Sequence, residues 1–224
     1  MPHITRKIIR PSQELVTAVG RYSSATLHEA QGRRGALSSI LKPIDRAMSL
    51  CGPAFTVQCA PGDNLMLQLA IAYAQRGDVV VVSVGDFPEA GAFGDLLCTA
   101  AQTKGLAGLV IDTGVRDSAL LCEMGFPVFS RSICIKGTIK ETVGTINQPV
   151  SVGGQVVRPG DIIRGDADGL VLVLREEAAD VALKAQAREE MEENKRVRYL
   201  RGDDVVAVNG LQAVIEKKGI TFDD

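Results

Sequence analysis

Four consecutive valines, Val79–Val82, restrict the fold of this chain more than any other feature. A strand whose residues are all apolar is covered on both faces, which is typical of the inside of a parallel sheet. Helical patterns flank it at Asn64–Gln75 and Leu96–Lys104, and a second apolar strand is predicted at Gly108–Ile111. Strands that alternate with helices across short Gly and Asp turns form βαβ units. The middle of the chain therefore predicts an α/β fold.

The segments on either side of this region complete the predicted fold. Helices are predicted from Ser12, from Ser23 or Ser24 to Gln31 and over Ser118–Met124, and strands over Cys51–Cys59 and from Val128. Between Thr138 and Leu174 short strands are separated by turns at Gly153-Gly154 and Pro159-Gly160-Asp161, which predicts antiparallel or barrel-like pairing. A long charged helix, Glu176–Leu200, is expected to cover the domain's own face or to pack on a neighbouring chain. Because the sequence has no low-complexity linker or internal repeat, we expect one domain over residues 1–224.

The composition excludes several classes of partner. The chain has 224 residues, of which 46% are apolar and 23% charged, as in ordinary globular proteins. A formal net charge of −2 gives no attraction to nucleic acid or to anionic lipid. Only 4% of the residues are aromatic and Trp is absent, so a surface for stacking bases is not expected. We therefore expect neither nucleic acid nor a membrane as a partner.

The cysteines and the N-terminus indicate the compartment. The five cysteines are scattered and form no CxxC pair, so we predict buried, reduced thiols at Cys51, Cys59, Cys98, Cys122 and Cys134. Residues 1–11 lack the apolar segment of a signal peptide. No apolar stretch reaches the length of about 18 residues that a membrane span needs. We expect the protein in the cytosol.

Two polar segments follow the predicted strands. Gly91–Leu97 opens a helix, where backbone N–H groups and the helix dipole suit a carboxylate or a phosphate. Its spacing matches neither GxGxxG nor a P-loop, so no nucleotide is favoured. Asp112–Asp117 follows the next strand, and ligands of parallel α/β sheets collect at the carboxyl ends of strands. Arg116 can bind a carboxylate through two hydrogen bonds, and Asp117 can bind a hard cation through oxygen.

Each of these groups also has a structural interpretation. Asp95 could simply be the acid that starts a helix, and Arg116 with Asp117 could be a surface ion pair with a helix cap. Other polar side chains are not expected to carry chemistry: His28, Lys104, Lys136, Lys140, Asp166 and Asp168. For His28 we expect a structural hydrogen bond, and for the last two aspartates a plain turn.

Seven short motifs occur in a fixed order: Ala25–Arg33, Pro61–Asn64, Gly94–Leu97, Gly114–Asp117, Met124–Val128, Pro159–Asp161 and Asp168-Gly169. Over about residues 12–200 the chain thereby resembles the 4-hydroxy-4-methyl-2-oxoglutarate / 4-carboxy-4-hydroxy-2-oxoadipate aldolase family. That family shares its fold with the regulator of ribonuclease E activity A. The resemblance implies an αββα sandwich of the swivelling phosphohistidine-domain type with a long C-terminal helix, assembled as trimers or hexamers. Past Gly202 the sequence departs from the family, and no structure is predicted there.

The resemblance also implies roles for individual residues. The pyruvyl group would be bound by Arg116 and by the backbone of Gly94, Asp95, Leu96 and Leu97. Asp117 would be the direct ligand of Mg²⁺ or Mn²⁺, and Asp95 would hold that metal through water. Glu192 on the C-terminal helix would complete this shell from the next subunit, with Glu193 as the alternative. No organic cofactor is implied.

The activity that the resemblance implies is a metal-dependent retro-aldol cleavage. Either of the two named 2-oxo acids would give pyruvate plus pyruvate or oxaloacetate, as in the degradation of protocatechuate or gallate. The metal and Arg116 would stabilise the pyruvate enolate, and water held by Asp95 and Glu192 would move the protons. Oxaloacetate decarboxylation, which gives the same enolate, would be a side activity. Two alternatives are a non-catalytic ribonuclease-binding regulator and a dedicated oxaloacetate decarboxylase.

Overall fold

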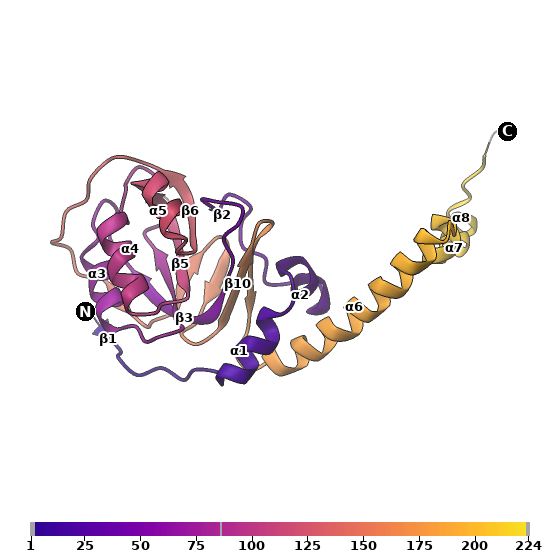
Figure 1. Ribbon diagram of the computed structural model, residues 1–224, viewed down its shortest axis with the longest axis horizontal. Coiled ribbons are helices and arrows are strands. Elements are labelled where there is room, and N and C mark those ends of the chain that lie inside the picture. Colours follow the sequence, from indigo (N-terminus) through magenta and orange to yellow (C-terminus); the bar gives the residue numbers. More distant parts are fainter. Residues whose placement is uncertain (1–2, 86, 223–224) are drawn as a thin grey trace.

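The computed structural model describes residues 3–85 and 87–222, and at its centre lies a mixed β-sheet. Four parallel strands form the middle of this sheet: β3 (Leu50–Gln58), β4 (Val79–Ser83), β5 (Gly108–Val115) and β6 (Val128–Ile133). The helices between them are α3 (Leu65–Tyr73), α4 (Asp95–Thr103) and α5 (Ser118–Met124). Figure 1 shows these three helices together on one side of the sheet. The predicted βαβ core is confirmed.

The valines of β4 divide the core into two parts. Val80 and Val82 pack in the apolar cluster that includes residues of α3, α4 and α5. Val79 and Val81 pack in a second cluster on the opposite face. All four side chains are at most 1% exposed, so both faces of the strand are covered as the all-apolar run predicts.

Short strands complete this nearly closed sheet: β2 (Lys42–Pro43), β7 (Thr145–Ile146), β10 (Ile162–Asp166) and β11 (Gly169–Val173) pair antiparallel, and β1 (His3–Ile4) is parallel to β7. β8 (Val150–Val152) and β9 (Gln155–Val157) form a separate two-stranded antiparallel sheet. β10 pairs with both β3 and β11, and Ala36 bridges Val171 of β11. The antiparallel pairing expected after Thr138 is confirmed, as is a mixed α/β fold. The sandwich type that the family resemblance implies stays a prediction.

One strand is longer than predicted. β5 continues past Ile111 to Val115, with a bulge between Ile111 and Gly114, so Asp112 belongs to the strand and not to a loop. The reason is a second partner for the strand, because Gly91 bridges Gly114 and the Ala92 N–H donates to the Gly114 carbonyl at 3.0 Å. This pairing joins the two polar segments that the sequence singles out.

The N-terminal helices pack against the C-terminal one. α1 (Gln13–Gly20) and α2 (Ser24–Ala30) begin at the predicted residues, capped by Ser12 and Ser23. They contact α6 (Ala178–Leu200), whose first turns bury Ala178, Val181, Ala182 and Ala185. The beginning of α6 thus covers the protein's own face, which is one of the two arrangements expected for this helix.

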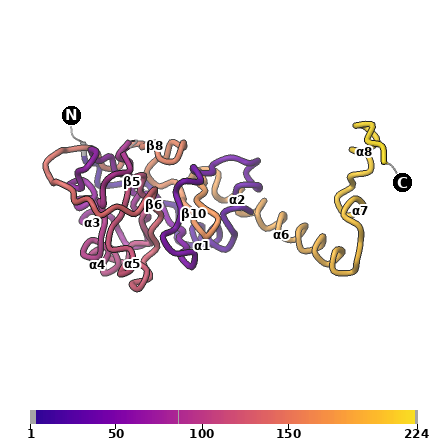
Figure 2. Tube along the Cα trace, turned by 90° about the horizontal axis from the view of Figure 1, so that it is seen from above, coloured from indigo at the N-terminus to yellow at the C-terminus, as the bar shows by residue number. Residues whose placement is uncertain are grey.

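The rest of α6 leaves the body of the protein. Figures 1 and 2 show the helix extending away from the sheet, with α7 (Val205–Asn209) and α8 (Gln212–Lys218) at its far end. Large apolar side chains remain exposed along it, among them Leu183 and Leu200. Neither α6 nor any other helix in residues 3–85 and 87–222 is long and apolar enough to cross a membrane.

The five cysteines are free thiols, but the prediction that all are buried is wrong for three of them. Cys59 and Cys98 are buried, whereas Cys51, Cys122 and Cys134 are half-buried. Burial raises the pKa of Cys59 to about 12 and that of Cys51 and Cys98 to about 11. These three thiols are protonated near neutral pH and are poor nucleophiles.

The buried carboxylate of Asp63 joins the start of α3 to the segment that follows β6. It accepts hydrogen bonds from the backbone N–H groups of Leu65 (2.8 Å), Glu141 (2.8 Å) and Thr142 (2.7 Å). Burial opposes the ionisation of Asp63, but these three donors outweigh it and hold its pKa below the usual value. The ionised carboxylate therefore stabilises the folded protein.

We predict that Asp63→Asn lowers the free energy of unfolding by about 1–3 kcal/mol near pH 7, because in either orientation the amide NH₂ would face at least one of these backbone donors. A depressed folded pKa gives stability that is present above the usual aspartate value of about 3.9 and is lost as the pH falls through the folded value. The difference between wild type and variant should therefore be constant above about pH 5 and shrink below about pH 4. Urea unfolding at several pH values measures it.

Asp168→Asn, at an exposed turn, is the matched control and should unfold like the wild type. Equal unfolding midpoints for Asp63→Asn and wild type at pH 7 would contradict the stabilising role of Asp63.

Candidate active site

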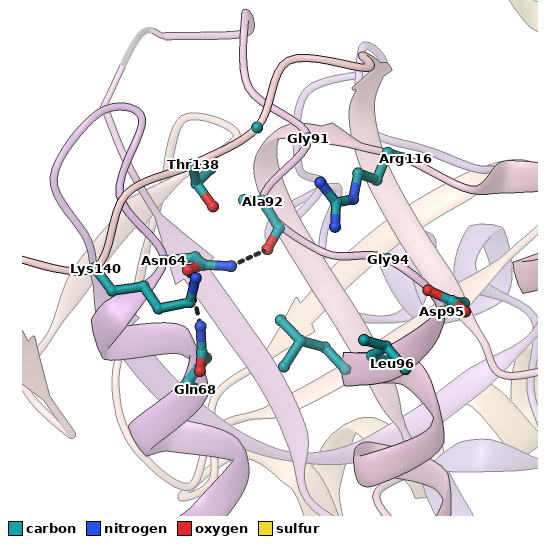
Figure 3. Close-up of a pocket in the computed structure, with 12 residues that line it drawn as sticks. Asn64, Gln68, Gly91, Ala92, Gly94, Asp95, Leu96, Arg116, Thr138 and Lys140 are labelled. Carbon is teal, nitrogen blue, oxygen red and sulfur yellow. Dashed lines mark hydrogen bonds between the residues drawn. The ribbon is translucent and has the colours of Figure 1, made fainter.

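A pocket of about 380 Å³ lies at the carboxyl end of the parallel strands, where α3 and α4 begin. Its lining residues come from four places in the chain: Asn64, Gln68, Gly91, Ala92, Gly94, Asp95, Leu96, Leu97, Arg116, Gly137, Thr138 and Lys140. Figure 3 shows Arg116 on one side of this pocket and Lys140 on the other. Ligands of open α/β sheets bind at this edge. Both predicted segments therefore contribute to one pocket.

The start of α4 forms one wall of the pocket. Phe93, which is buried and stacked on Phe126 with ring centroids 6.2 Å apart, fixes the backbone just before the helix. Gly94 is the N-cap residue, and Asp95, Leu96 and Leu97 form the first turn. The N–H groups of a first helical turn have no acceptor within the helix and carry the positive end of the helix dipole. This wall therefore suits an anionic group.

Gly94 lies in close contact with the end of β5. A Cβ atom added to it would lie 2.3 Å from Asp117 Oδ2 and 3.1 Å from Arg116 Cγ. Any side chain at position 94 would therefore push apart the start of α4 and the two charged groups beside it. The glycine is required by this close approach, since its φ of −144° is open to other residues.

Arg116 and Asp117 stand immediately after β5. The backbone N–H of Arg116 donates to the Phe93 carbonyl at 2.9 Å, which holds the backbone of Arg116 beside the pocket that this residue lines. Arg116 Nε lies 3.4 Å from Asp117 Oδ2, and the same oxygen accepts from the Asp95 N–H at 3.4 Å. One carboxylate oxygen is thus shared by the two segments.

The structural interpretation of these residues is half right. The ion pair between Arg116 and Asp117 is present, and both side chains are partly exposed. Asp117 also occupies the N-cap position of α5, but its side chain makes no capping hydrogen bond there. Its backbone is left-handed, with φ 56° and ψ 35°, an uncommon conformation for a residue other than glycine. The Asp117 carboxylate instead accepts from the start of α4.

Asn64 and Gln68, on the opposite wall, belong to the site although sequence reasoning gave them no role. The Asn64 amide donates to the Ala92 carbonyl at 2.9 Å, and Gln68 donates to Asn64 Oδ1 at 3.0 Å (Figure 3). The buried Asn64 thereby ties α3 to the segment before α4. Its signal was present in the Pro61–Asn64 motif, and Gln68 lies one helical turn later.

Lys140 was expected to carry no chemistry because its sequence context is polar. It stands instead at the pocket wall, on the segment that Asp63 holds through the N–H groups of Glu141 and Thr142. The pocket thus has an exposed ammonium group in addition to the Arg116 guanidinium. His28, by contrast, makes the expected structural contact, with Nδ1 2.9 Å from the Arg34 carbonyl.

The structure does not bring Glu192 and Glu193 to this pocket within one chain. Glu192 pairs with Arg188 at 2.8 Å and Glu193 pairs with Arg196, all four on α6. Figure 1 shows α6 leading away from the side of the sheet where α3 and α4 lie. A contribution of either glutamate to the pocket would therefore require a second chain, as the family resemblance implies.

The oxygen donors at the pocket edge are compatible with a hard cation. Asp117 offers a partly exposed carboxylate beside Arg116, and Asp95 lies in the adjacent turn. Mg²⁺ in proteins is held by one or two carboxylates and completes its coordination with water and substrate. Across residues 3–85 and 87–222, no three His, Cys, Asp or Glu side chains come together as a metal cluster. Asp117 is the residue that would contact a metal here.

Known proteins share this fold and part of this sequence. A protein of Halalkalibacterium halodurans with the provisional name 4-hydroxy-4-methyl-2-oxoglutarate aldolase is 38% identical over 182 residues, which are 81% of this chain and 84% of that protein. A crystal structure of Streptomyces coelicolor RraAS2, described as an unusual member of the RNase ES inhibitor RraA family, superposes with a TM-score of 0.76 at 32% identity over 86% of this chain and 100% of the other. An uncharacterized Pseudomonas syringae protein superposes with a TM-score of 0.80 at 25% identity, over 90% of this chain and all of the other.

A family model described as RraA-like, Aldolase/RraA, matches residues 16–172, a range that contains the pocket and the whole parallel sheet. The family resemblance seen in the ordered motifs is thus confirmed, and the chain belongs to the RraA-like family of aldolases and RraA proteins.

Proposed function

We propose that this protein is a divalent-metal-dependent lyase that cleaves a 4-hydroxy-2-oxo acid and releases pyruvate. One observation carries the proposal: the Arg116 guanidinium and the first turn of α4 line the same pocket, with the Asp117 carboxylate in contact with both. Two groups suited to an anion thus lie beside a carboxylate suited to a cation, which supports the proposal. A 2-oxo acid carries a carboxylate and a neighbouring keto oxygen. The carboxylate can bind to the anion-binding groups, and the keto oxygen can bind to a cation.

The protein's own groups bind and orient the substrate. The carboxylate of the 2-oxo acid accepts hydrogen bonds from the first turn of α4, and Arg116 contacts the 2-oxo oxygen on which negative charge develops. Asp117 would hold Mg²⁺ or Mn²⁺, which would supply further positive charge to stabilise the enolate. Lys140 extends the positive potential to the far side of the pocket, where a second carboxylate of the substrate would lie. The substrate class is therefore a dicarboxylic or tricarboxylic 2-oxo acid.

Two protons move in the cleavage. The 4-hydroxyl group loses its proton as the C3–C4 bond breaks, and C3 of the resulting pyruvate enolate gains one. Asp95, half-buried at the pocket wall, would hold the water that exchanges these protons, together with Glu192 of a neighbouring chain.

Oxaloacetate loses CO₂ to give the same enolate, so decarboxylation follows as a side activity. The named 4-methyl and 4-carboxymethyl acids are the candidate substrates, in degradation of aromatic acids.

We predict that purified protein releases pyruvate from 4-hydroxy-4-methyl-2-oxoglutarate or 4-carboxy-4-hydroxy-2-oxoadipate, and that excess chelator abolishes this activity. Addition of Mg²⁺ or Mn²⁺ should restore it, because Arg116 alone would otherwise have to stabilise the charge of the enolate. Pyruvate formation is followed by coupling to lactate dehydrogenase. Oxaloacetate, tested in parallel, compares kcat/KM for decarboxylation and cleavage.

Each outcome has a distinct meaning. Full turnover in excess chelator would exclude the metal-dependent mechanism. A larger kcat/KM for oxaloacetate would make decarboxylation the main activity. No pyruvate from any of these acids, together with inhibition of a ribonuclease, would favour the role of ribonuclease inhibitor, by which the family of the Streptomyces neighbour is described.

We predict that Arg116→Lys lowers kcat as well as raising KM. Lysine keeps the charge but loses the planar pair of donors that can serve a carboxylate and an enolate oxygen together. Loss of one preorganised contact of this kind costs about 10²–10³ in rate. Steady-state kinetics measure it, with the exposed Arg33→Lys as control. A variant with unchanged kcat would show that Arg116 contributes to binding alone.

We predict that the site is shared between chains. Asp117→Ala and Glu192→Ala should each be nearly inactive alone. After co-refolding, the mixture should recover part of the activity, because some sites combine an intact Asp117 with an intact Glu192 from the neighbour. Size-exclusion chromatography should show a trimer or hexamer, and pyruvate release measures the recovery.

Glu190→Ala, two positions from Glu192 on the same exposed helix, is the matched control and should stay active. Tagged hetero-oligomers that form without regaining activity would contradict the shared site, as would a fully active monomer.

A further inference from the structure

Asp112 is a half-buried carboxylate that the proposed chemistry does not use. Its Oδ1 accepts from the Val84 N–H at 2.7 Å and its Oδ2 from the Ser83 hydroxyl at 3.2 Å. Burial raises the pKa of Asp112 to about 6, although the Val84 N–H, the Ser83 hydroxyl and the charge of Arg131 all favour ionisation. The carboxylate lies in the wall of a second pocket, of about 590 Å³, so protons from solvent can reach it.

Residues of Asp112–Asp117 contact the described parts of the chain that leads from β4 to α4, on either side of residue 86. Thr113 Oγ1 donates to the Phe87 carbonyl at 2.7 Å, the Gly114 carbonyl accepts from Ala92, and the Arg116 N–H donates to Phe93. At the far end Asp117 accepts from Asp95, the first residue of α4. Asp112 makes the first contact of this series, at the point where the chain leaves β4.

We propose that Asp112 is a positioning residue: by holding Ser83 and Val84 it sets the path of the chain toward Gly94 and so orients the N–H groups of α4 for the substrate carboxylate. It does not touch the substrate. The inference rests on the proposed function only for the identity of that substrate. The hydrogen bonds that carry it are independent of any activity.

The position of Asp112 makes this orientation dependent on pH. An ionised carboxylate is a stronger acceptor than a neutral one, so the contact with Val84 is strongest above about pH 6 and weakens as the pH falls through that value. Of the described groups around it, Arg131 on β6 carries charge, while Gln58, Ser83 and Ser151 are neutral. The nearby Cys59 thiol, with a pKa of about 12, stays protonated throughout.

Amide NMR of the ¹⁵N-labelled protein tests the positioning directly. Between pH 4.5 and 8 the Val84 amide should titrate with a midpoint near 6, and the amides of Asp95, Leu96 and Leu97 should move with the same midpoint. Asp112→Asn, which has no titrating group, should abolish this shared transition. Ser83→Ala retains the bond between Asp112 and Val84 and should retain the transition, with a higher midpoint because a donor that favours ionisation is lost.

Kinetics test the consequence for the proposed activity. For Asp112→Ala we expect kcat/KM to fall about tenfold to a hundredfold at pH 7.5, as expected for loss of a hydrogen bond to a charged acceptor. In the wild type kcat/KM should fall as the pH drops through about 6, whereas Asp112→Asn should lack that decrease. If Asp112 contributed to global stability alone, folded Asp112→Asn would have the same pH profile of kcat/KM as the wild type.

The two hypotheses can fail separately. If the wild type turns over none of the 2-oxo acids but the amides share their transition, the proposed function fails and the positioning role stands. If Val84 titrates while the amides of α4 do not, or if Asp112→Asn keeps the transition, the positioning role is wrong. Should the Asp112 variants not fold, the titration of wild type and Ser83→Ala still decides whether Val84 and α4 move together.

Discussion

The candidate site depends on the pairing between the end of β5 and the chain that leads into α4. Hydrogen bonds from Ala92 to Gly114 and from Arg116 to Phe93 make two segments, separated by about twenty residues in sequence, into one unit. The backbone of Arg116 is therefore joined directly to the segment that begins α4. Preorganised donors do not have to reorient as charge develops, which is the main source of electrostatic catalysis. The bulge in β5 lies just before Gly114, the residue that bridges Gly91.

Close approach at Gly94 has an electrostatic consequence. Asp117 lies within hydrogen-bond range of the Asp95 N–H and beside the Arg116 guanidinium, so its negative charge is partly neutralised by its own neighbours. The left-handed backbone of Asp117 costs on the order of 1–3 kcal/mol in a folded protein. Conformations of this kind cluster at functional sites, where surrounding structure enforces them. At Asp117 the enforcing structure is the end of β5 and the start of α4, which both contact this residue.

The sequence predicts those parts of the fold that local patterns encode. The four valines of β4, the Ser12 cap and the bounds of α5 at Ser118–Met124 all follow from periodicity and capping residues. The extension of β5 does not, because Asp112-Thr113-Gly114 has turn composition and its partner is a distant backbone segment. The sequence does not predict the position of Lys140 for the same reason. Asp63, far earlier in the chain, holds the segment that puts Lys140 at the pocket. For Glu192, the local pattern predicts the helix on which it lies but not the residues that its side chain contacts.

The exposed half of α6 bears on how Glu192 could serve another chain. Arg188 lies 2.8 Å from Glu192 and 3.5 Å from Glu29 of α2, so within one chain Glu192 already has a partner. Both side chains are about a third exposed, and ion pairs of this kind contribute only about 0–1 kcal/mol. Releasing Glu192 therefore costs little, and Arg188 keeps Glu29 when it happens. The weak pair with Arg188 holds the Glu192 side chain along the helix. It would not prevent Glu192 from turning to a cationic site on a neighbouring protomer.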